Sequence, residues 1–166
     1  MGIVLAFPIL YILLLLQTTL ASQITLLSGC ADLILLWLAA WGLQKQVKSA
    51  WVWTGLAAIA VAYLTAVPWY VPLIGYAAIT LATRFVNKIV WQSPLLMMFM
   101  VTILGSLFMN SMTYITLAIN GVFIPFAVGL VQVIIPSLLI NLLLSLPIYA
   151  IAKDTAQWVY PLEATE

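Results

Sequence analysis

The sequence contains no histidine, a single cysteine, and only five basic and four acidic side chains among its 166 residues. The missing histidine removes the commonest catalytic base and metal ligand. Cys30 alone can form neither an intrachain disulfide nor a thiolate metal cluster. A soluble domain usually has about a quarter of its residues charged, against 5% here. The net charge of +1 also excludes a polybasic nucleic-acid binder, so no nucleic-acid partner is expected.

What the chain does contain is apolar: 66% of its residues are hydrophobic and its mean hydropathy is +1.24. A helix needs roughly 20 apolar residues to cross a bilayer. Polar, Gly and Pro clusters divide the chain into six such segments, at about residues 4–20, 24–43, 51–67, 72–85, 94–119 and 132–151. Residues 123–131 are predicted to be an interfacial or re-entrant piece. The expected fold is therefore an all-α integral membrane protein, a six-transmembrane-helix bundle formed as one domain by residues 1–166.

The first apolar segment could instead be a cleaved signal peptide, because "TLAS" suits a cleavage site. Its flank lacks a basic region and its apolar run is too long for a signal peptide, so a retained helix is favoured.

The basic residues predict the orientation of these helices. All five fall at the end of, or after, the second, fourth or sixth segment: Lys45, Lys48, Arg84, Lys88 and Lys153. The alternate turns have no Lys or Arg, so the positive-inside rule places both termini in the cytoplasm. Several tryptophans near the basic side, including Trp41, Trp53 and Trp91, are expected to form an aromatic belt at that membrane surface.

Asp32 is an ionisable residue inside the second segment. A charged Asp at the centre of a membrane helix costs on the order of 3 kcal/mol, so it should face the bundle or be protonated. An ion or proton site is one interpretation. A neutral carboxyl bonded to Ser28 or to a neighbouring helix is the favoured one, since no second acid or intramembrane base accompanies it.

Polar residues also form stripes in the last two segments. Ser137, Asn141 and Ser145 recur every four residues and so lie on one face of a helix. The fifth segment has a similar stripe that includes Ser106 and Asn110. Helices associate in lipid through packing and interhelical hydrogen bonds, which predicts that these stripes, with Asp32, mark helix-helix or partner packing. For Asn141, a ligand or partner contact is the alternative.

The sequence has no HExxH, GxSxG, Walker loop or paired carboxylates. No enzymatic activity, cofactor or metal is therefore expected.

The order of the segments resembles a known family. "GCADLILLWLAAWGL", "NKIVWQSPLLMMFMVTILGSLF" and "VIIPSLLINLLLSLPIYAIA", in this order, look like the rod shape-determining protein MreD family. An Asp-Leu pair opens the second helix of that family, here Asp32-Leu33. A Pro…Leu-x-Asn…Pro pattern marks its last helix, here Pro136, Asn141 and Pro147. The acid that often ends the third segment of the family is missing from "AYLTAVPWY".

The resemblance implies a non-catalytic scaffold subunit of the bacterial cell-wall elongation machinery, or elongasome, in the inner membrane. It would take part in peptidoglycan synthesis and cell shape by binding MreC, a single-span membrane protein. A RodA-type glycosyltransferase and its transpeptidase are further expected partners, together with membrane lipid. The family also looks similar in fold to substrate-binding subunits of energy-coupling-factor transporters. A vitamin-type transporter subunit is therefore the alternative, although the first segment lacks the Ala-x-x-x-Ala spacing usual in those proteins.

Overall fold

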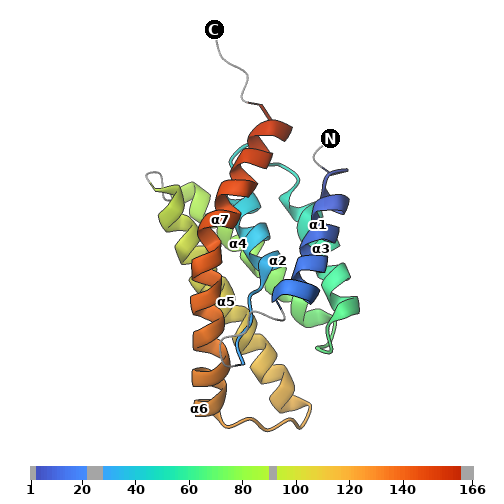
Figure 1. The fold of residues 1–166 in the computed structure, drawn as a ribbon, viewed down its shortest axis with the longest axis vertical. Coiled ribbons are helices and arrows are strands. Elements are labelled where there is room, and N and C mark those ends of the chain that lie inside the picture. The colour runs from blue at the N-terminus through green and yellow to red at the C-terminus, as the bar shows by residue number, and fades with distance from the viewer. Residues whose placement is uncertain (1–2, 22–27, 90–92, 162–166) are drawn as a thin grey trace.

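The computed structural model describes residues 3–21, 28–89 and 93–161, and these residues form a helical bundle without a β-strand (Figure 1). Its helices follow one another along the chain as α1 (Ala6–Leu16), α2 (Leu33–Gly42), α3 (Ala50–Leu64), α4 (Tyr70–Ile89), α5 (Pro94–Ile119), α6 (Phe126–Gly129) and α7 (Ile135–Val159). A π turn, η1 (Gln17–Ala21), extends α1, and a second, η2 (Leu130–Ile134), joins α6 to α7. Because α6, η2 and α7 form one continuous helix, the described residues make six helical rods.

Two of these rods are long and apolar enough to cross a membrane. Pro94–Ile119 has 26 residues and Phe126–Val159 has 34, with mean hydropathies of 1.8 and 2.3 in their most apolar stretches. Only 33% and 28% of those stretches are buried in the bundle. Most apolar side chains of α5 and α7 are therefore exposed or only half-buried, whereas the core helix of a soluble protein would bury them.

α2 is the central helix of the bundle. Nine of its ten residues are buried, and it packs against α7, α4, α5, α3 and α1. A helix that is apolar on all sides is typical of a protein core or a membrane span, and α2 is covered by neighbouring helices. Residues 28–32, which lead into α2, therefore enter the middle of the bundle.

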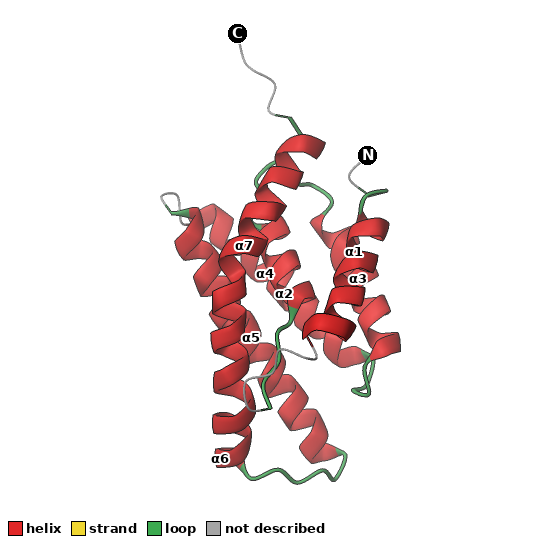
Figure 2. Cartoon of the chain, in the orientation of Figure 1, coloured by secondary structure: helices red, strands yellow, loops and turns green. Residues whose placement is uncertain are grey.

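The predicted second helix differs most from the observed one. Residues 24–27 lie outside the described residues, but residues 28–32 are not helical, and α2 begins only at Leu33. Figure 2 shows this segment as a loop that leads up to the start of α2 along the flank of α7. Asp32 is thus the N-cap of α2 rather than a residue inside a continuous helix.

The piece predicted at residues 123–131 is also not separate from the sixth segment. Phe126 begins a helix that continues without a break to Val159. Pro136 lies in the first turn of α7, just where η2 ends, so its missing N–H falls where the hydrogen-bonding pattern changes from π to α. The proline is therefore accommodated without interrupting the helix. The fourth helix is also longer than predicted, since α4 runs from Tyr70 to Ile89 instead of over residues 72–85.

Candidate functional site

The non-helical segment 28–32 is held against α7 by its own backbone N–H groups. Ser28 donates to the carbonyl oxygen of Gln132 at 3.0 Å. Cys30 donates to Ser137 Oγ at 3.2 Å, and Asp32 donates to Asn141 Oδ1 at 2.9 Å. Every second N–H of the segment therefore meets α7 or the η2 turn that precedes it.

The spacing of the polar residues on α7 matches this segment. Two residues of extended chain rise about 6.6 Å, and four residues of α-helix rise about 6 Å. An extended segment that runs along a helix can therefore bond to a helical side chain every four residues, as Cys30 and Asp32 do with Ser137 and Asn141. Two residues of the stripe predicted for helix packing, Ser137 and Asn141, therefore bond to the backbone of the non-helical segment.

The close approach of the two chains depends on a glycine. A Cβ atom placed on Gly29 would lie 2.5 Å from the backbone nitrogen of Ser137 and 2.8 Å from Pro136 Cβ. Real Cβ atoms do not approach other atoms this closely, so only glycine allows the segment to lie directly on α7.

Gln17 bonds to the other side of the same segment. Its Nε2 donates to the carbonyl oxygen of Ala31 at 2.8 Å, and its Oε1 accepts from the backbone nitrogen of Leu33 at 2.7 Å. One amide thus satisfies one acceptor and one donor where the chain enters α2. Buried backbone groups without such partners cost about 1–3 kcal/mol each. Gln17 was not among the predicted site residues.

The Asp32 side chain caps α2. Its Oδ1 accepts from the backbone nitrogen of Leu35 at 2.9 Å and from the Tyr76 hydroxyl at 3.5 Å. N-caps of this kind contribute about 1 kcal/mol, and the helix N-terminus favours a negative group. The structure thus gives Asp32 a partner on the neighbouring α4, Tyr76, rather than the predicted Ser28.

Asn141 connects three elements. It is buried, accepts from Asp32, and donates through Nδ2 to Ser106 Oγ of α5 at 2.9 Å. The predicted stripes of α5 and α7 therefore meet at this pair. Asn110 and Ser145 instead bond within their own helices, to the carbonyl oxygens of Ser106 at 2.8 Å and Leu142 at 2.6 Å.

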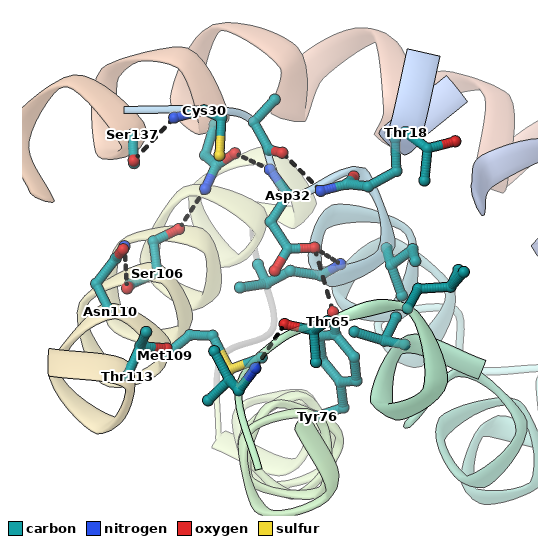
Figure 3. A pocket seen from close by; sticks show the side chains of 18 of the residues that line it. Thr18, Cys30, Asp32, Thr65, Tyr76, Ser106, Met109, Asn110, Thr113 and Ser137 are labelled. Atoms are coloured by element: carbon teal, nitrogen blue, oxygen red, sulfur yellow. Dashed lines mark hydrogen bonds between the residues drawn. The ribbon is translucent and has the colours of Figure 1, made fainter. Parts of the chain in front are cut away.

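A cavity of about 430 Å³ lies beside the segment (Figure 3). Its lining includes polar side chains from five places in the chain: Thr18 in η1, Asp32, Tyr76 in α4, Asn110 in α5 and Ser137 in α7. Binding pockets for small molecules usually measure about 300–1,000 Å³. The cavity is thus large enough for a small organic molecule.

The basic residues lie toward the other end of the bundle. Arg84 Nη2 donates to the carbonyl oxygen of Val47 at 2.6 Å, which joins α4 to the loop between α2 and α3. Ser49 Oγ, in that loop, lies 3.2 Å from the hydroxyl of Tyr160, the residue that follows α7. The segments that carry Lys45, Lys48, Arg84 and Lys153 therefore meet at one end, where both termini also lie (Figure 1). Lys88 belongs to the last turn of α4, but its side chain is outside the described residues.

The predicted aromatic belt is wrong for two of its members. Trp41 and Trp53 are buried, with ring centroids 4.6 Å apart, and Trp37 stacks on both. These rings form part of the core beneath the basic end. Trp91 lies outside the described residues.

No family model, curated protein or solved structure matches this chain.

Proposed function

We propose that this chain is a multi-pass protein of the bacterial cytoplasmic membrane and a non-catalytic scaffold subunit of the cell-wall elongation machinery. One observation carries the proposal. The two sequence features that carry the resemblance to the MreD family, the Asp32-Leu33 pair and the asparagine between two prolines, are in direct contact, since Asn141 Oδ1 accepts from the backbone of Asp32. Both features thus help to hold the start of α2 against α7, which supports treating them as parts of one motif.

The proposed topology has six spans with both termini in the cytoplasm. Its support is the position of the basic residues, which lie at one end of the bundle together with the two termini. Positive charge collects on the cytoplasmic side of membrane proteins. The outward apolar faces of α5 and α7 would then contact lipid or the helices of partners.

The partners proposed are an MreC-like single-span protein and a RodA-type glycosyltransferase with its transpeptidase. Their contacts with this chain would be made mainly between helix faces, because the described loops between the rods are short. In lipid, such contacts depend on close packing and a few hydrogen bonds.

Co-purification from a rod-shaped bacterial host tests this function. The tagged chain, solubilised in mild detergent, is expected to recover the single-span partner, and its depletion is expected to turn rods into spheres. Recovery of no cell-wall protein, together with rods of normal shape after depletion, would contradict the proposal. A tagged, unrelated six-span protein at the same expression level is the control for nonspecific recovery.

The cavity favours a second candidate function, a substrate-binding subunit of a small-molecule transporter. Such a subunit needs a pocket with convergent polar groups, and Asp32 and Tyr76 lie together in one. Recovery of a pair of ATPases in place of cell-wall proteins in the same experiment would select this candidate.

A further inference from the structure

The cavity contains one acidic side chain and no basic one. Asp32 is the only ionisable carboxyl among its lining residues, and the lining includes neither Lys nor Arg. The basic residues whose side chains are described belong to loops and helix ends at the other end of the bundle. A carboxylate removed from water without an opposite charge is costly, so a positively charged ligand would supply what the lining lacks.

The two oxygens of the Asp32 carboxyl have different surroundings. Oδ1 accepts hydrogen bonds from Leu35 N and the Tyr76 hydroxyl. The other oxygen points away from these donors toward the middle of the cavity (Figure 3). The carboxyl is thus fixed to the start of α2 through Oδ1 while its second oxygen faces the cavity.

Asn110 lines the cavity from α5, opposite α2. Its Nδ2 donates to the carbonyl oxygen of Ser106, in its own helix, so its Oδ1 remains as an acceptor. The group that suits Asp32 carries a positive charge and N–H donors, and Asn110 adds an acceptor on the opposite wall. A protonated primary amine has both, with three donors on one nitrogen.

We propose that this cavity is a binding site for a protonated primary amine, whose ammonium group bonds to the carboxylate of Asp32, while Asn110 on the opposite wall accepts a second donor of the ligand. A bare metal ion fits less well, because hard cations need six or more oxygens at 2.0–2.6 Å and the cavity is far larger than one ion. The proposal concerns the cavity alone and holds for either function proposed above.

The amine could come from two sources with the same chemistry: the ethanolamine headgroup of a phospholipid, or a free amine from solution. The full chain is therefore placed in nanodiscs of three compositions: phosphatidylglycerol alone, or phosphatidylglycerol mixed with phosphatidylethanolamine or with phosphatidylcholine. Choline carries the same charge as ethanolamine but no N–H donor. Free ethanolamine and putrescine are titrated into the first composition.

The measurement is the thermal midpoint followed by tryptophan fluorescence, with native mass spectrometry of the bound molecule. A ligand at 100 times its Kd is expected to raise the midpoint by about 5 °C or more. A rise with phosphatidylethanolamine alone assigns the lipid as the source, and a saturable rise with the free amines assigns the solute. No rise with either source, or an equal rise with phosphatidylcholine, would overturn the proposal.

Two variants test whether the amine-dependent rise of the thermal midpoint comes from binding in the cavity. Asp32→Asn keeps an oxygen for the Leu35 N–H but removes the charge, so the amine-dependent rise is expected to disappear. Asn110→Leu removes the second acceptor and is expected to reduce the rise, even if Asp32→Asn fails to fold. Asp154→Asn, an exposed acid on α7, is the matched control and should keep the full rise. An unchanged amine-dependent rise of the midpoint in both cavity variants would contradict the proposal.

Discussion

Asn141 Oδ1 accepts a hydrogen bond at 2.9 Å from the backbone nitrogen of Asp32, a residue 109 positions earlier in the chain. This bond lies where segment 28–32 turns into α2. The same amide donates to Ser106 Oγ, so a single buried side chain fixes α5, α7 and the start of α2 relative to one another. Buried irregular backbone is stable only when its polar groups find partners, and here side chains of neighbouring helices provide them.

Replacement of Asn141 by leucine is expected to destabilise the protein by about 2 kcal/mol. The variant leaves the Asp32 N–H and Ser106 without their partner, and an unpaired buried group costs about 1–3 kcal/mol. The thermal midpoint in one fixed detergent should fall by about 4–8 °C.

Ser145→Ala is the control for Asn141→Leu. Ser145 is buried four residues further along the same helix, but its hydroxyl bonds only to Leu142 of its own helix. Its midpoint should stay close to that of the parent protein. Equal losses in the two variants would mean that the connection to Asp32 has no special role.

Gln17→Met is expected to loosen the segment from the side of α1. The substitution keeps the length of the side chain but removes both hydrogen bonds, to Ala31 and from Leu33. Amide hydrogen exchange at Leu33 should accelerate at least tenfold, which corresponds to about 1.4 kcal/mol. Gln44→Met is the matched control, because the Gln44 side chain bonds to Ala40, only four residues earlier in the chain. Slow exchange at Leu33 in the Gln17 variant would contradict this role.

Gly29→Ala tests how closely the segment must approach α7. The added methyl group would meet the backbone of Ser137, which cannot move without disturbing α7, so a loss of more than 2 kcal/mol is expected. Gly55→Ala is the control, since nothing lies within 4 Å of a Cβ at that position in α3. Helix propensity favours alanine there by about 1 kcal/mol. Thermal melts of the two variants should therefore shift in opposite directions, and a neutral Gly29→Ala would refute the close approach.

Hydropathy predicted the helical rods well where one apolar segment forms one straight helix, as in α5, whose bounds match the predicted 94–119. It failed at residues 28–32, because the small residues 28–31 do not lower the average hydropathy enough to indicate a break in a helix. Averaged hydropathy cannot distinguish a buried loop from a buried helix. Two local signals were present: Gly29, and Asp32 placed directly before an apolar run, as an N-cap would be.

The candidate site was predicted only in part. Asn141, Ser106 and Ser137 do bond across elements, but two of those bonds go to backbone groups of the broken helix, which no periodicity in α7 could reveal. Gln17 was missed because it ends the first segment among other polar residues, where an amide normally indicates a membrane surface. Its role depends on a fold in which α1 lies beside the start of α2.

The topology predicts which ends of the chain a membrane-impermeant thiol reagent can reach. In a Cys30→Ser background, Thr155→Cys places a thiol two residues after Lys153, at the basic end of the bundle. Asn120→Cys places one at the exposed C-cap of α5, where the turn to α6 begins. Positive residues are retained on the cytoplasmic side, so the first thiol should face the cytoplasm and the second the outside. Intact spheroplasts should therefore label Asn120→Cys at once and Thr155→Cys only after permeabilisation. Labelling of Thr155→Cys in intact spheroplasts would contradict the proposed orientation. Labelling of neither thiol after permeabilisation would show that the reagent cannot reach these positions in the folded protein.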